Sequence, residues 1–265
     1  MLGKCLRYDL KYVYKVLIVF YLIDMVFAIL TRILFSFDNS FMLHILALIS
    51  SGTTISFMFS IIINNLMRVW ARFVKNVYGD ESYLTHTLPI NKSTIYTSKF
   101  LSSIITMFTS ILVIILCVFI AYYSKENLEV LKNTLQFFAT VMNSTTIKVI
   151  LTAFFVIFLE FTTILQAGFT GLLLGHRSNN LKMVKSIIYG FLNYLFVVAI
   201  SVLIIYIIGL FNPSIMALFN SNISNTLTVD IVKTALVLGI CLYIILIGFY
   251  YFIDIKVFKK GVNVD

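Results

Sequence analysis

The chain has 265 residues, of which 60% are hydrophobic and only 12% are charged, and its mean hydropathy is +1.01. Soluble domains carry roughly 25% charged residues, so this composition excludes a soluble protein. The formal net charge of +9 is typical of a membrane protein with basic cytoplasmic loops, and no nucleic-acid partner is expected. The cysteines Cys5, Cys117 and Cys241 lie far apart, so neither a disulfide framework nor a metal site is predicted.

Residues 1–15 have the pattern of an amphipathic helix. The apolar face holds Leu2, Leu6, Leu10 and Val13, and the basic face holds Lys4, Arg7, Lys11 and Lys15. This pattern predicts an interfacial helix at the cytoplasmic surface of the bilayer. The alternative is that these residues only flank the first span. Asp9 falls near the apolar face and has no explanation from the sequence.

Six apolar stretches are each long enough to cross a bilayer as a helix, which takes about 20 residues. They are Val16–Phe37, Met42–Leu66, Leu101–Tyr123, Val149–Leu174, Ile187–Phe211 and Ile231–Ile253. The two prolines, Pro89 and Pro213, fall between stretches, where they interrupt no span. We therefore predict an all-α polytopic membrane protein in which residues 1–265 form a single transmembrane domain.

The basic residues predict the orientation of these spans. Fifteen of the 20 lysines and arginines lie before the first span, in the loops after the second and fourth spans, or after the sixth. Because basic residues collect on the cytoplasmic side, both termini are expected in the cytoplasm. The outer segments are then Asp38–Phe41, Ser124–Lys148 and Asn212–Asp230.

The sequence contains no recognisable catalytic constellation. No glycine-rich loop ends in Lys-Ser or Lys-Thr, as phosphate binding requires, and no GxSxG-like serine occurs. The histidines His44, His86 and His176 form no HExxH pair. The chain is therefore not expected to be an enzyme or to hold a cofactor or metal of its own.

The loop between the second and third spans predicts a short cytoplasmic helix over residues 79–90. Gly79 can end the preceding helix, Asp80 and Glu81 suit the start of a new one, and Pro89 limits its length. This helix would offer a partner the side chains of Tyr83, Leu84, Thr87 and Leu88. Alternatively, it packs on its own bundle.

This loop resembles the conserved segment of ABC-2 type transporter permeases. In that family an acidic residue precedes a leucine-x-x-x-leucine-proline stretch and a basic turn, and a lysine opens the third span. The matching residues here are Glu81, Leu84, Leu88, Pro89, Lys92 and Lys99. The resemblance implies a permease, as a homodimer or a pair of different permeases, docked on two separately encoded ATPase subunits that bind ATP and magnesium. The ATPase-coupling residues would be Asp80, Glu81, Tyr83, Leu84, Thr87, Leu88 and Pro89.

The leading functional hypothesis is therefore the membrane subunit of an ATP-driven exporter. The large outer domain of some family members is missing, so the chain resembles the small Gram-positive exporters of peptide toxins, bacteriocins and antibiotics. The expected substrate is an amphipathic or hydrophobic compound, with peptides favoured, and the expected location is a bacterial plasma membrane. The alternatives are an ion-gradient-driven secondary transporter and a non-transporting membrane protein that confers bacteriocin immunity.

Polar residues within the spans are further candidates, because charges at this depth are rare and functional. Asp24 and Glu160 are expected to face the bundle interior, either as a structural charge pair or along a polar path, with Arg32 on a face similar to that of Asp24. Small polar residues also form a stripe on the second span, where they either pack helices or line the pathway: Gly52, Ser56, Ser60 and Asn64. A similar stripe on the fourth span, Ala167, Gly171 and Gly175, is expected to pack helices.

Overall fold

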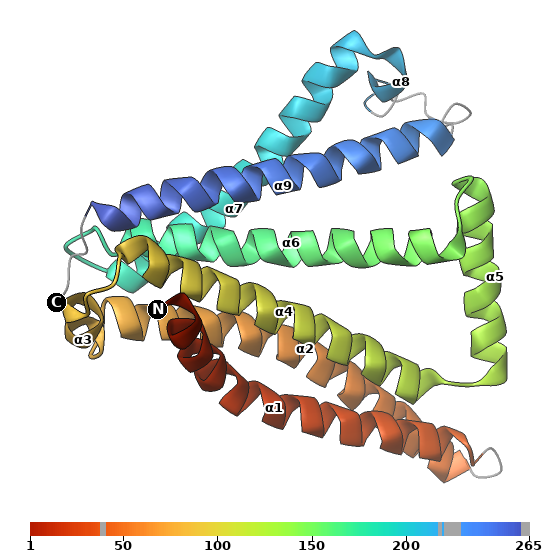
Figure 1. Ribbon diagram of the computed structural model, residues 1–265. Helices are drawn as coiled ribbons and strands as arrows, with labels where there is room; N and C mark the ends of the chain where they lie inside the picture. The colour runs from red at the N-terminus through yellow and green to blue at the C-terminus, as the bar shows by residue number, and fades with distance from the viewer. Residues whose placement is uncertain (38–40, 217–218, 220–228, 261–265) are drawn as a thin grey trace. The chain divides into compact units, whose positions relative to one another are not determined.

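The computed structural model describes residues 1–37, 41–216, 219 and 229–260, and every regular element among these residues is a helix. Within these described residues, six helices are long and apolar enough to cross a membrane, and Figure 1 shows their arrangement in the chain. They are α1 (Leu2–Phe35), α2 (Phe41–Val77), α4 (Lys92–Tyr122), α6 (Thr146–Gly175), α7 (Lys182–Phe211) and α9 (Val229–Lys259). The shorter helices are α3 (Ser82–Thr87), α5 (Lys125–Val141) and α8 (Pro213–Met216). The prediction of an all-helical chain with six candidate spans is confirmed.

The long helices extend beyond the apolar stretches that predict them. With 37 residues and a rise of 1.5 Å per residue, α2 is about 55 Å long, whereas a bilayer core is about 30 Å thick. Most of the predicted outer segment Asp38–Phe41, and residues 217–218 and 220–228 of the segment Asn212–Asp230, lie outside the described residues.

The chain divides into two compact units. The first, Met1–Leu131, contains α1 to α4 and the beginning of α5, and the second, Lys132–Gly261, contains the rest of α5 and α6 to α9. Each unit therefore holds three of the six candidate spans.

In the first unit, α1 packs against both α2 and α4, and hydroxyl groups line the buried face of α4. The buried hydroxyl side chains of this helix are Ser98, Ser102, Ser103, Thr106 and Ser110. The amide of Asn65 on α2 donates to Ser110 Oγ at 2.7 Å and accepts from Thr106 Oγ1 at 3.1 Å. Hydrogen bonds of this kind hold helices together in lipid, where hydrophobicity gives little attraction between them.

In the second unit, α6 and α7 cross with their backbones in contact. A Cβ added to Gly171 would lie 2.5 Å from Gly190 Cα, and one added to Gly175 would lie 2.4 Å from Ser186 N. Real Cβ atoms do not approach this closely, so only glycine fits at these two positions. The predicted packing role of the small residues on the fourth span is confirmed for both glycines.

Residues 1–15 do not form an element of their own. They are the beginning of α1, which continues without a break into the first span. Asp9 and Val13 are buried on the side of this segment that packs against the protein. The position of the segment at the membrane surface and the cytoplasmic location of the termini stay predictions.

Candidate functional site

The loop between α2 and α4 is built by local hydrogen bonds at the end of α2. Gly79 N donates to Val74 O at 3.0 Å, and this turn is tight, since a Cβ at Gly79 would lie 3.3 Å from Lys75 O. The carbonyl of Glu81 then accepts from Thr85 N and Thr85 Oγ1, which starts α3.

The helix α3 has six residues, so it is shorter than the predicted helix over residues 79–90. Asp80 and Glu81 precede it instead of forming its first turn. Leu88 has an extended backbone with ψ of 138°, because the proline that follows disfavours helical geometry at the preceding residue.

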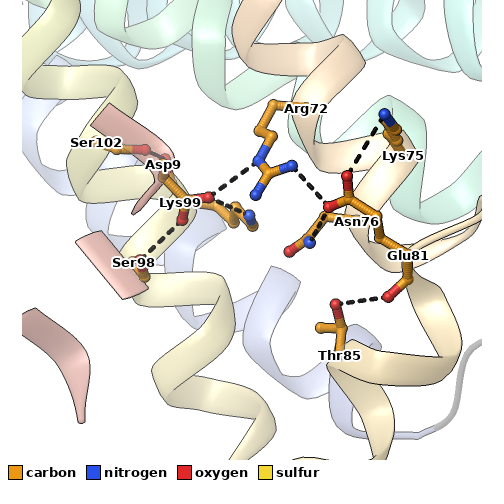
Figure 2. Close-up of polar contacts among 9 residues, drawn as sticks. All are labelled: Asp9, Arg72, Lys75, Asn76, Glu81, Thr85, Ser98, Lys99 and Ser102. Carbon is orange, nitrogen blue, oxygen red and sulfur yellow. Dashed lines mark hydrogen bonds and ion pairs between the residues drawn. The ribbon is translucent and has the colours of Figure 1, made fainter. Parts of the chain in front are cut away.

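The carboxylate of Glu81 turns back to α2, where three side chains hold it (Figure 2). Arg72 Nη1 donates to Glu81 Oε2 at 2.7 Å, Asn76 Nδ2 donates to the same oxygen at 2.9 Å, and Lys75 Nζ lies 3.5 Å from Oε1. Partial burial raises the pKa of Glu81, but the Asn76 hydrogen bond and the Arg72 and Lys75 charges lower it below its usual value. Glu81 is therefore ionised at neutral pH and anchors the start of α3.

Arg72 also binds Asp9, and it thereby connects α3 to α1. Its Nε lies 3.3 Å from Asp9 Oδ1, and its guanidinium lies 4.6 Å from the centre of the Tyr12 ring. Asp9 is 2% exposed and accepts further hydrogen bonds from Lys99 Nζ and from Ser98 Oγ, the latter at 3.0 Å. We call Asp9, Arg72, Lys75, Glu81 and Lys99 the charged cluster (Figure 2).

The charged cluster explains the position of Asp9, which sequence reasoning missed. Its one signal in the sequence is an acidic residue on an otherwise apolar helix face. The partner Lys99 lies 90 residues away in the sequence, so no local pattern identifies the pair.

The side of α3 that faces away from the cluster is apolar and exposed. Tyr83 is 77% exposed, Leu84 66% and Leu88 52%, and Thr87 is also exposed. We call these four residues the α3 surface. Ser82 and Thr85 face inward and are buried. Of the predicted coupling residues outside this surface, Asp80 and Pro89 are exposed.

Asp24 is buried at 0% exposure. Among the described residues, its carboxyl group has no stronger donor beside it than the Cys117 thiol of α4. Arg32 does not pair with it. Its guanidinium lies 4.8 Å from the centre of the Tyr123 ring instead.

Glu160 accepts hydrogen bonds at 2.6 Å from the hydroxyls of Tyr194 and Tyr243, and it thereby joins α6 to α7 and α9. Asp24 belongs to the first unit and Glu160 to the second, so a pairing of the two stays a prediction. Sequence reasoning missed a further buried acid, Asp254, which lies just beyond the last predicted span. It accepts from Gln166 Nε2 at 2.5 Å and from Thr170 Oγ1 at 3.1 Å.

The small polar stripe on α2 lies beside the buried face of this helix and not on it. Ser56, Ser60 and Asn64 each donate to a carbonyl four residues earlier, at 2.9 Å. The residues on the buried face instead include Thr54 and Asn65. The stripe therefore does not contribute to the core of the first unit, and its role as a pathway lining stays a prediction.

Comparisons of the chain with protein-family models, with curated proteins and with solved structures found no match. Among the described residues, no three histidine, cysteine or acidic side chains gather into a group that could hold a metal ion. The candidate functional site is the charged cluster of the first unit together with the α3 surface. Its ion pairs connect a short exposed helix to three long ones.

Proposed function

We propose that this chain is the transmembrane permease subunit of an ATP-binding cassette exporter and that α3 is its coupling helix. The observation that carries the proposal is the contrast between the exposed surface of α3 and its anchored start. The helix presents Tyr83 and Leu84 outward, and Glu81, directly before its first residue, is bound to Arg72 within the charged cluster. A partner that grips the exposed side moves a helix that is firmly attached to the spans.

The charged cluster supplies the route for this movement. A displacement of α3 pulls on Glu81 and therefore on Arg72 of α2. Arg72 passes the displacement to Asp9 of α1, and Asp9 in turn is bound to Lys99 of α4. The three long helices of the first unit then respond together to ATP binding in the partner.

The remaining features of the assembly follow from the resemblance to ABC-2 permeases. Two permease copies, as a homodimer, bind two ATPase subunits, which hold the ATP and magnesium and carry out hydrolysis. The proposed location is the plasma membrane of a Gram-positive bacterium, with both termini in the cytoplasm. The proposed cargo is an amphipathic or hydrophobic compound, with peptides as the first class to test.

The proposal is tested by purifying the tagged full-length chain from its native membranes and identifying the proteins that accompany it. We expect a protein with a Walker motif and measurable ATP hydrolysis. Replacing Tyr83 and Leu84 by serine is expected to reduce its recovery at least about tenfold, because buried aromatic and apolar anchors carry most of the energy of an interface.

The matched control replaces two similarly exposed apolar residues of α5, Leu131 and Phe137, by serine, and is expected to leave recovery unchanged. The Glu81→Gln variant keeps the α3 surface and is expected to retain the ATPase while reducing the stimulation of hydrolysis by substrate. The absence of any Walker-motif protein from the wild-type preparation would overturn the proposal.

A further inference from the structure

The N-terminal half of α1 has one side turned to the protein and one turned away from it. Asp9, Val13 and Leu17 are buried, and Tyr14 forms a 2.8 Å hydrogen bond with Thr109 of α4. The basic residues of this segment are all exposed: Lys4, Arg7, Lys11 and Lys15.

The exposed side carries a concentrated positive charge. At 100° per residue, the four basic positions fall within an arc of about 80°, and Asp9 lies on the opposite side of the helix. Asp9 is the only acidic residue before Asp24, and its charge is satisfied inside the protein by Lys99 and Arg72. No acidic side chain of this segment therefore neutralises the basic arc.

The length of α1 places this arc at the edge of a bilayer. Its 34 residues extend over about 51 Å, about 20 Å more than the hydrocarbon core. The first predicted span begins at Val16, so residues 2–15 are the part that exceeds the core. The first turns of α1 also run at an angle to the rest of the helix (Figure 1).

We propose that this basic arc, formed by Lys4, Arg7, Lys11 and Lys15, is a binding surface for the headgroups of anionic phospholipids. Anionic lipid surfaces attract basic residues next to a membrane, and the attraction falls off within a Debye length. Because Asp9 and Val13 pack against the protein, the contact with lipid is primarily electrostatic. The proposal does not depend on the exporter function.

The experiment compares phosphatidylglycerol with phosphatidylcholine, each added in steps to the full-length chain in detergent micelles, and follows the thermal unfolding temperature. We expect phosphatidylglycerol to stabilise the wild type more strongly, and 500 mM NaCl to remove the difference. Replacing Lys4, Lys11 and Lys15 by glutamine should raise the phosphatidylglycerol concentration at half effect at least about tenfold, since each basic residue at an anionic surface contributes several-fold.

Two further variants separate a local site from general charge. The same lysines replaced by arginine keep the charge and are expected to behave as wild type. The matched control replaces Lys125, Lys132 and Lys148, which are also exposed, by glutamine and should retain the lipid preference. An equal loss in this control would overturn the proposal, as would a wild type that does not distinguish the two lipids.

Inorganic phosphate serves as the probe for a free anion. It is expected to give no comparable stabilisation, and an equal effect would mean that the arc binds soluble anions and not a lipid surface. If the glutamine variant yields no folded protein, the lipid preference of the wild type and its loss in 500 mM NaCl test the proposal by themselves. A lipid preference that persists in 500 mM NaCl contradicts an electrostatic surface.

Discussion

Asp9 and Asp24 lie on the same helix and are both buried, but their surroundings differ. Asp9 is bound by Lys99, Arg72 and Ser98, whereas Asp24 has only the weak donor Cys117 beside it among the described residues. A buried charge is tolerated when it is paired, and an unpaired polar group away from water opposes folding. Removal of the charge is therefore expected to be costly at Asp9, where it would leave Lys99 unpaired, and not at Asp24.

Changing each aspartate to asparagine tests this difference. We expect Asp9→Asn to lower the free energy of unfolding in micelles by about 3 kcal/mol, because it leaves the buried Lys99 without its counter-charge. Asp24→Asn should leave this free energy unchanged or raise it by about 1 kcal/mol. Unfolding followed by circular dichroism gives both values, and an equally large loss at Asp24 would show that this carboxyl has a stabilising partner.

At this scale the sequence predicts which residues are unusual but not what they contact. Glu81 is recognisable from the loop pattern, yet its carboxylate turns inward to Arg72 and Asn76, where it anchors α3. Its partners are set by the way α2 ends at Gly79, and hydropathy carries no information on this turn. The same holds for Glu160, whose two tyrosine partners lie on different helices.

At the scale of elements, helix type was predictable and helix length was predictable only in part: Gly79 indicates where α2 ends, at Val77, whereas α3 is shorter than the helix predicted over residues 79–90. A segment that crosses the lipid needs apolar side chains, so apolar stretches identify the spans. A helix continues for as long as its backbone hydrogen bonds can form, and α2 therefore passes through Arg68 and Arg72 to Val77. Likewise, α3 begins only after Glu81, whose carbonyl takes the first hydrogen bond.

The crossing of α6 and α7 makes a prediction at this scale. Gly171→Ala is expected to lower the free energy of unfolding by about 1–3 kcal/mol, because the added methyl group forces two touching backbones apart. Gly52→Ala is the control, since a Cβ there meets nothing within 4 Å, and it should raise stability by up to about 1 kcal/mol through its better helix propensity. Thermal unfolding of both variants in micelles provides the comparison, and equal effects would contradict the close crossing.

At the scale of the whole molecule, the distribution of basic residues orients the six candidate spans. Most lysines and arginines lie in segments that the alternation of spans places on one side, and this side is expected to be the cytoplasm. The charged cluster and the α3 surface are expected on the same side. The identity of the partner that binds there is inferred from the sequence of a single loop. Composition and fold alone do not predict it.

Reporter fusions test this orientation. A fluorescent protein fused after residue 265 is expected to fluoresce, because it folds in the cytoplasm. Alkaline phosphatase fused after Lys132 is expected to be active, because α5 is predicted outside and the enzyme needs disulfides that form there. The reverse result for both fusions would place α3 outside the cell and remove the basis for an ATPase partner.

The pairing of Asp9 with Lys99 also sets an order of events in biosynthesis. The two residues are 90 positions apart, and at about 5–20 residues per second the ribosome takes roughly 5–18 s to reach the lysine after the aspartate. During this interval α1 has emerged without the partner that its acid requires. The helix α1 is therefore secured by α4, and the nascent first unit is complete only when α4 arrives.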